Sequence, residues 1–139
     1  MKWTTVLAVI LVGLVWGLPG RGEDKDNEKP CRAEIGADGI QHIEIVGGSY
    51  FFRPKHVIVR VNVPVELTVC KESGFVPHNI VMKSPEAGIE FDESLSTDPK
   101  IIKFTPTKVG RYSFYCSKKL LFFESHREKG MEGVLEVVE

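Results

Sequence analysis

The feature that most constrains the fold is a series of short runs in which apolar and polar residues alternate. In the run 56–62, Val57, Val59 and Val61 share one side of an extended chain, because successive side chains of a strand point to opposite faces. Gly and Pro residues separate such runs along most of the chain. The predicted strands are 40–46, 56–62, 65–71, 79–83, 100–105, 111–116 and 133–138. Many short strands without a long helical pattern predict an all-β sandwich.

The chain has 139 residues, which suits one domain with its own core. We expect that domain to span 40–139.

Residues 84–99 show no clear pattern and are expected to form a long connection, which is common in Greek-key sandwiches. Tyr112, near the start of a predicted strand, suits a tyrosine corner, in which its hydroxyl bonds back to the main chain. The net charge of −1 gives no bulk attraction to nucleic acid.

The first 22 residues have the composition of a signal peptide. Lys2 supplies a positive start and residues 6–18 are almost entirely apolar. That run is shorter than the roughly 20 residues of a membrane helix, so we expect cleavage after Gly22, with a retained membrane anchor as the alternative. Residues 23–39 are expected to be a flexible lead-in, because the stretch 23–30 is highly charged. The protein is therefore expected in the periplasm or cell envelope.

Four metal-donor side chains stand out. The stretch from Cys116 to Met131 places a thiol, an imidazole (His126) and a thioether in one loop, and His78 supplies a second imidazole upstream. One cysteine thiolate, two histidines and a weak axial methionine are the ligand set of a mononuclear blue-copper site. We predict that these four residues bind one copper ion per chain. Asn79, beside His78, is expected to hydrogen-bond across the site.

Each of these donor side chains also has an alternative interpretation, in which it binds no metal and has only a structural role. A lone cysteine is usually a buried thiol, a lone histidine a surface residue and a lone methionine core filler. Zinc also accepts cysteine and histidine, but a thioether is a poor zinc donor and a good partner for Cu(I). His42 and His56 are interpreted as ordinary surface or edge residues, and Met82 as a core residue.

Three cysteines are present. If Cys116 is a metal ligand, Cys31 and Cys70 remain as a candidate disulfide, since exported proteins commonly pair their cysteines. The alternative is two free thiols, because spacing alone does not fix connectivity.

The chain resembles the cupredoxins, the family that includes plastocyanin and azurin. The matching segments are Phe52-Arg-Pro54, Val76-Pro-His-Asn79, Gly110-Arg-Tyr-Ser-Phe-Tyr-Cys116 and His126-Arg-Glu-Lys-Gly-Met-Glu-Gly-Val-Leu-Glu-Val137. The resemblance covers about 40–138 and implies a Greek-key β-sandwich with copper at one end. It also implies that Asn79 ties together the two segments that carry the ligands.

The chain departs from the small blue-copper proteins in one respect. Nine residues separate Cys116 from His126, a longer spacing that resembles the ligand loop of copper nitrite reductases. This leaves the colour and the reduction potential of the site open. Ser117 and Tyr115 flank Cys116, so the histidine that links the blue copper of those enzymes to a catalytic copper is missing. We therefore expect neither an enzyme nor a small-molecule substrate.

The loop insertion contains four consecutive apolar residues, Leu120, Leu121, Phe122 and Phe123. In one interpretation they fold down and cap the end of the sandwich. In the other they form an exposed patch beside His126 where a redox partner docks. Nearby Lys and Arg residues could steer an acidic partner to that patch.

The leading functional hypothesis is an exported copper protein that carries single electrons between redox protein partners. The alternative is a periplasmic copper-binding protein for copper delivery or storage. No nucleic acid is expected as a partner, and a membrane only if the N-terminal segment is retained.

Overall fold

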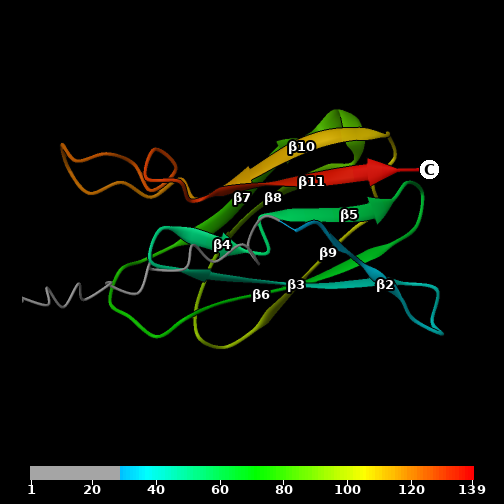
Figure 1. Cartoon of the computed structure of the whole chain (residues 1–139), viewed down its shortest axis with the longest axis horizontal. Helices are drawn as coiled ribbons and strands as arrows, with labels where there is room; N and C mark the ends of the chain where they lie inside the picture. Colours follow the sequence, from blue (N-terminus) through cyan, green and yellow to red (C-terminus); the bar gives the residue numbers. More distant parts are fainter. Residues whose placement is uncertain (1–28) are drawn as a thin grey trace, which may run out of the picture.

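The computed structural model describes residues 29–139, and the predicted signal peptide lies outside the described residues. Two β-sheets pack face to face (Figure 1). The first sheet contains, in spatial order, β1 (Cys31–Arg32), β5 (His56–Arg60), β11 (Glu132–Val138), β10 (Gly110–Tyr115), β7 (Asn79–Ser84) and β8 (Ile89–Ser94). The second contains β2 (Glu34–Ile35), β3 (Gln41–Gly48), β6 (Val65–Lys71) and β9 (Lys100–Phe104), with β4 (Phe51–Arg53) paired to β3. This all-β, Greek-key sandwich confirms the predicted fold class.

All seven predicted strands are present, with ends that differ by no more than two residues. The connection expected over 84–99 is instead a 3-10 turn, η2 (Pro85–Ala87), followed by β8. That expectation was wrong because β8 offers only two apolar side chains facing inward, Ile89 and Phe91, and acidic residues occupy much of the rest. As an edge strand it pairs with β7 alone, and charged residues are typical of such edges.

Part of the expected lead-in belongs to the sandwich. Cys31 and Arg32 pair in parallel with β5, and Glu34 and Ile35 pair with β3. Ala33, between these two short strands, is buried against the core. Within residues 29–139, no helix is long and apolar enough to cross a membrane.

The core lies between the two sheets, where the alternating runs predict it. Val57 and Val59 of β5 are buried, as are Val65, Leu67 and Val69 of β6. The remaining core is supplied by residues of both sheets, including Phe52, Ile80, Met82, Phe114, Leu135 and Val137. Met82 is thus a core residue, as expected.

The aromatic residues near the ligand-bearing strands are also fixed in place. The rings of Phe52 and Phe114 pack edge to face, with centroids 5.4 Å apart. The hydroxyl of Tyr112 donates a hydrogen bond of 2.9 Å to the backbone oxygen of Lys108, which confirms the tyrosine corner. β10, which leads into Cys116, is therefore held at both ends.

The candidate disulfide between Cys31 and Cys70 is not formed, and both cysteines are free thiols. Cys31 lies in β1 of the first sheet. Cys70 lies in β6 of the second sheet, on the face opposite to the buried Val65, Leu67 and Val69. It therefore points out of the sandwich, away from the first sheet.

Candidate metal centre

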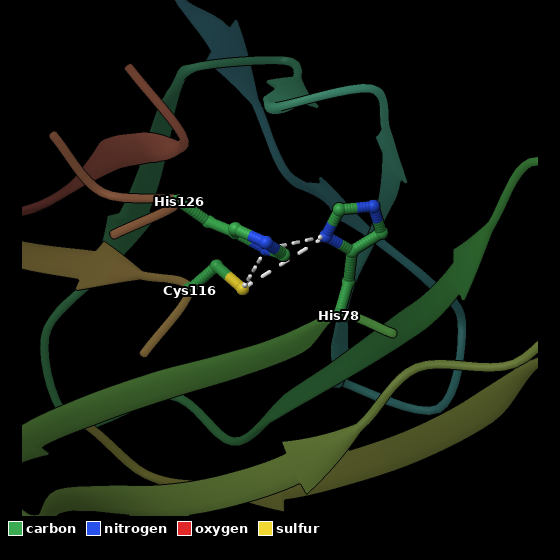
Figure 2. A group of neighbouring side chains, drawn as sticks. All are labelled: His78, Cys116 and His126. Carbon is green, nitrogen blue, oxygen red and sulfur yellow. Dashed lines mark hydrogen bonds between the residues drawn. The ribbon is translucent and has the colours of Figure 1, made fainter. Parts of the chain in front are cut away.

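Three of the predicted ligands meet at one end of the sandwich (Figure 2). The Sγ atom of Cys116 lies 3.5 Å from Nδ1 of His126 and 3.9 Å from Nδ1 of His78. The two Nδ1 atoms are 3.1 Å apart. All three donor atoms lie within 4.8 Å of one another, close enough to bind a single ion.

Strand pairing brings His78 and Cys116 together although they are far apart in sequence. His78 directly precedes β7 and Cys116 directly follows β10. β7 and β10 are antiparallel neighbours, with Tyr115 opposite Val81. The start of one strand therefore lies beside the end of the other, and both side chains reach the same end of the sheet.

His126 comes from the loop between β10 and β11, and the backbone of that loop is hydrogen-bonded near the site. The backbone nitrogen of His126 donates to the oxygen of Lys118, and that of Met131 donates to the oxygen of His126, each at 2.9 Å. The nitrogen of Cys116 donates to the oxygen of Met131 at 3.0 Å. The residues that carry three of the predicted ligands are thus linked directly to one another.

Burial keeps the two imidazoles in the neutral form that a metal needs. Cys116 is fully buried, and His78 and His126 are each only 5% exposed. Burial, followed by the charges of His126 and Lys71, lowers the pKa of His78 to about 4. Burial and the charge of Lys129 also lower the pKa of His126. Both imidazoles are therefore neutral at pH 7 and keep a lone pair for a metal ion.

The donor set fits copper. A thiolate and two neutral imidazoles combine one soft ligand with two borderline ones, in a site from which water is largely excluded. Met131 is completely buried and belongs to the same apolar cluster as Cys116. A Cβ atom on Gly47 would lie 2.8 Å from Cδ1 of Leu95 and 3.3 Å from the Met131 methyl group, so this glycine leaves room for both side chains. The role of Met131 as an axial ligand stays a prediction.

Asn79 links the two ligand-bearing segments. Its Oδ1 accepts a hydrogen bond of 2.9 Å from the backbone nitrogen of Ser117, the residue after Cys116. Its Nδ2 donates to Oγ of Ser117 and to Oδ1 of Asp92, both at 2.8 Å. The side chain is nearly completely buried and uses both its carbonyl and its amide group.

Sequence reasoning missed Tyr50, which covers the histidine pair. Its ring meets the ring of His126 edge-on, with centroids 4.9 Å apart, and lies 6.1 Å from the ring of His78. Lys129 places its Nζ 4.3 Å from the centre of the Tyr50 ring. Tyr50 lies in the turn between β3 and β4, far in sequence from the donors, so no local pattern indicates this contact.

A cleft of about 460 Å³ opens beside His126, between the turn 73–77 and the loop 117–130. Its lining residues are Tyr50, Phe75, Val76, Pro77, Lys118, Lys119, Leu120, Phe123, Glu124, His126 and Lys129.

The capping interpretation of the four apolar loop residues is wrong. Leu120, Leu121, Phe122 and Phe123 are 64%, 75%, 100% and 62% exposed.

The other two histidines lie away from this cluster. His42 contacts Asp38 and Glu66 on the outer face of the second sheet. His56 contacts Glu136 at 2.6 Å. Both are ordinary surface or edge residues, as expected.

No protein-family profile matches the chain, and no curated protein matches it in sequence. Among solved structures, the metal-binding domain of the Streptococcus pneumoniae D39 Cu(I)-exporting P-type ATPase CopA, with Cu(I), aligns with a TM-score of 0.61 and 24% identity, over 80% of this chain and 97% of that one. Dithionite-reduced auracyanin from Roseiflexus castenholzii aligns with a TM-score of 0.56 and 22% identity, over 70% and 97%. Auracyanin A, a "blue" copper protein from Chloroflexus aurantiacus, aligns with a TM-score of 0.52 and 18% identity, over 72% and 100%. The chain has the cupredoxin fold, with a His–Cys–His cluster at one end of the sandwich.

Proposed function

We propose that this protein binds one copper ion through His78, Cys116, His126 and axial Met131, and that it carries single electrons between redox protein partners. The observation that carries the proposal is the buried convergence of one sulfur and two imidazole nitrogens within 4.8 Å. Copper bound there supplies a one-electron couple, Cu(II)/Cu(I).

The protein's own contribution is to fix the positions of the donor atoms and to exclude water from them. Cys116 and His78 lie at the ends of paired strands, and Asn79 bonds one segment to the other. Backbone hydrogen bonds fix His126 relative to Lys118 and Met131. A site that is held in one geometry opposes a change of oxidation state less than a flexible one would.

Electrons would enter and leave through His126. This imidazole lines the cleft beside the exposed apolar loop, whereas Cys116 is fully buried. Lys118, Lys119 and Lys129 also line the cleft, which favours a redox partner with an acidic surface. A protein partner, rather than a small-molecule substrate, remains our proposal.

Export remains part of the proposal. It rests on the composition of residues 1–22, which is typical of a signal peptide with cleavage after Gly22. The solved structure of the periplasmic domain of subunit II of cytochrome oxidase from Bradyrhizobium japonicum is similar in fold, with a TM-score of 0.51 and 17% identity. We place the protein in the periplasm or cell envelope.

A second candidate function is copper delivery or storage. It is favoured by the similarity to the metal-binding domain of a Cu(I)-exporting ATPase. The long loop between Cys116 and His126 also offers a segment that could open to release the ion. Copper that stays bound through repeated oxidation and reduction supports electron transfer. Copper that passes quickly to a chelator supports delivery.

The test of the copper site is an absorption and electron paramagnetic resonance spectrum of the copper-loaded protein, compared with Cys116→Ser and Cys70→Ser. We expect an intense visible thiolate-to-copper band in the unchanged protein and in Cys70→Ser, because Cys70 points out of the sandwich. The band should be absent in Cys116→Ser. A band that survives in Cys116→Ser would remove this cysteine from the site and refute the proposal.

A further inference from the structure

The tip of the long loop is an ordered turn made only of apolar residues. The backbone nitrogen of Phe123 donates to the oxygen of Leu120 at 2.9 Å, and Lys119 and Ser125 form a β-bridge below the turn. Leu121 has φ of +47°, a left-handed conformation that turns usually assign to Gly, Asn or Asp. Leu121 thus occupies an exposed, left-handed position where a polar turn residue such as Asn or Asp would fit with less backbone strain.

The apolar side chains of this turn point into solvent. Phe122 is fully exposed and Leu121 is 75% exposed. The loop projects past the ends of β10 and β11, as the orange trace in Figure 1 shows. On the neighbouring turn, Phe75 is also fully exposed and Val76 is 42% exposed. A cluster of exposed apolar side chains at one end of a protein marks a surface that is covered in use.

The cleft beside His126 accounts for only part of this surface. Leu120 and Phe123 line the cleft, but Leu121 and Phe122 do not. The two most exposed residues of the turn therefore lie on its convex outer side. A folded protein would need a matching groove to cover them, whereas the apolar interior of a bilayer surrounds a convex tip without one.

Positive charge surrounds the base of the turn. Lys118 and Lys119 lie on one arm of the loop and Lys129 on the other, and all three line the cleft with a single carboxylate, Glu124. Within residues 29–139, no salt bridge involves Lys118, Lys119 or Lys129. The three lysines outnumber the two carboxylates near them, Glu124 and Glu128. An apolar tip above a net positive base is complementary to a membrane surface, where acyl chains lie beneath anionic phosphates.

We propose that the turn 120–123 inserts into an anionic lipid bilayer, with Lys118, Lys119 and Lys129 on the lipid phosphates. The end of the sandwich that carries His126 would then lie at the membrane surface, so a redox partner that docks beside His126 would be a membrane-bound protein. This inference goes beyond the proposed function and does not depend on a bound metal, so metal-free protein can test it.

The experiment uses the metal-free full chain and vesicles of phosphatidylcholine with or without phosphatidylglycerol. A Phe122→Trp substitution in a chain that also carries Trp3→Phe and Trp16→Phe places the only tryptophan at the tip of the turn. We expect its emission to shift to shorter wavelength and to be quenched by brominated lipids when the vesicles are anionic. The signal reports the turn alone, whatever the N-terminal apolar run does.

Sedimentation with the vesicles adds a matched pair of variants, made in the chain without residues 1–22 so that the apolar run 6–18 cannot bind lipid itself. Phe122→Ser should lower binding to anionic vesicles at least about tenfold, because it removes an aromatic side chain that would be buried among the lipid acyl chains. Ile101→Ser should leave binding unchanged, although Ile101 is also exposed, because it lies on β9. Each of Lys118→Gln and Lys119→Gln should lower binding by about fivefold.

Two results would overturn the proposal. One is tryptophan emission that does not respond to anionic vesicles, and the other is equal binding by Phe122→Ser and Ile101→Ser. The apolar turn would then be a surface for a protein partner only. Circular dichroism checks that each variant is folded, which we expect because the substituted side chains of the loop and of β9 are exposed.

Discussion

Asn79→Ala tests whether the link between the two ligand-bearing segments stabilises the metal end. In the native protein Asn79 makes three hydrogen bonds, two to Ser117 and one to Asp92. The variant loses all three, whereas the pairing of residue 79 with Ser94 in β8 is made by the backbone and does not need the side chain. Asn79 directly follows His78, and Ser117 directly follows Cys116. The variant therefore removes the side-chain hydrogen bonds between these two neighbours of the predicted ligands.

The expected loss can be worked from these contacts. A hydrogen bond contributes a net of about 0.5–1.5 kcal/mol, and competition from water keeps the bond to the exposed Asp92 carboxylate near that range, so three bonds contribute about 1.5–4.5 kcal/mol. Ser117 and Asp92 are exposed, so water can replace Asn79 as their partner and no full desolvation penalty follows. We therefore expect the free energy of unfolding to fall by about 2 kcal/mol, toward the lower end of that range.

The assay is urea unfolding of the metal-free protein, which separates the effect from copper binding. The matched control is Ser96→Ala, which removes one exposed hydrogen bond to the backbone oxygen of Asp98. It should cost no more than about 0.5 kcal/mol. A loss in Asn79→Ala as small as in the control would refute the argument that this side chain holds the two segments together.

Two further predictions concern the metal-free protein. Gly133→Ala should lower the free energy of unfolding by about 1–3 kcal/mol, because its Cβ would clash with the ring of the buried Phe114. Ser113→Ala, on the exposed face of β10, should change that free energy by less than about 0.5 kcal/mol in the same urea titration. The free energy of unfolding should also fall as the pH is lowered from about 6.5 to about 4, since the unfolded chain binds a proton at His78 that the folded protein, with its lowered pKa, does not. His78→Gln should weaken this dependence, and an unchanged slope would contradict it.

The strands that sequence predicts well are those with one buried face. β5 and β6 alternate cleanly because Val57 and Val59, and likewise Val65 and Leu67, all face the core. β8 is missed because an edge strand needs little apolar surface. The pairings of β1 and β2 depend on β5 and β3, which lie later in the chain, so no local pattern indicates them.

The ligand cluster could be predicted because the chemistry of a copper site limits the choice of side chains. One thiol, two imidazoles and a weak axial thioether together are the ligand set of a blue-copper site, so these side chains could be picked out from the sequence. The orientation of the donors depends on the pairing of β7 with β10, which the predicted strands allow but do not require. Tyr50 is different in kind, since it contacts the two histidines through its ring and is not one of the predicted metal donors, so metal chemistry does not point to it.

The exposed turn shows where local sequence stops being informative. Four apolar residues satisfy a capping role and a docking role equally well, since both remove them from water. What separates the two roles is the direction of the loop, and that direction is set by backbone bonds at its base. The bridge between Lys119 and Ser125 and the hydrogen bond from His126 to Lys118 hold the two arms together, so the tip projects from the sandwich. The backbone bonds at the base of the loop thus have two effects. They fix the position of His126, and they direct Phe122 into solvent.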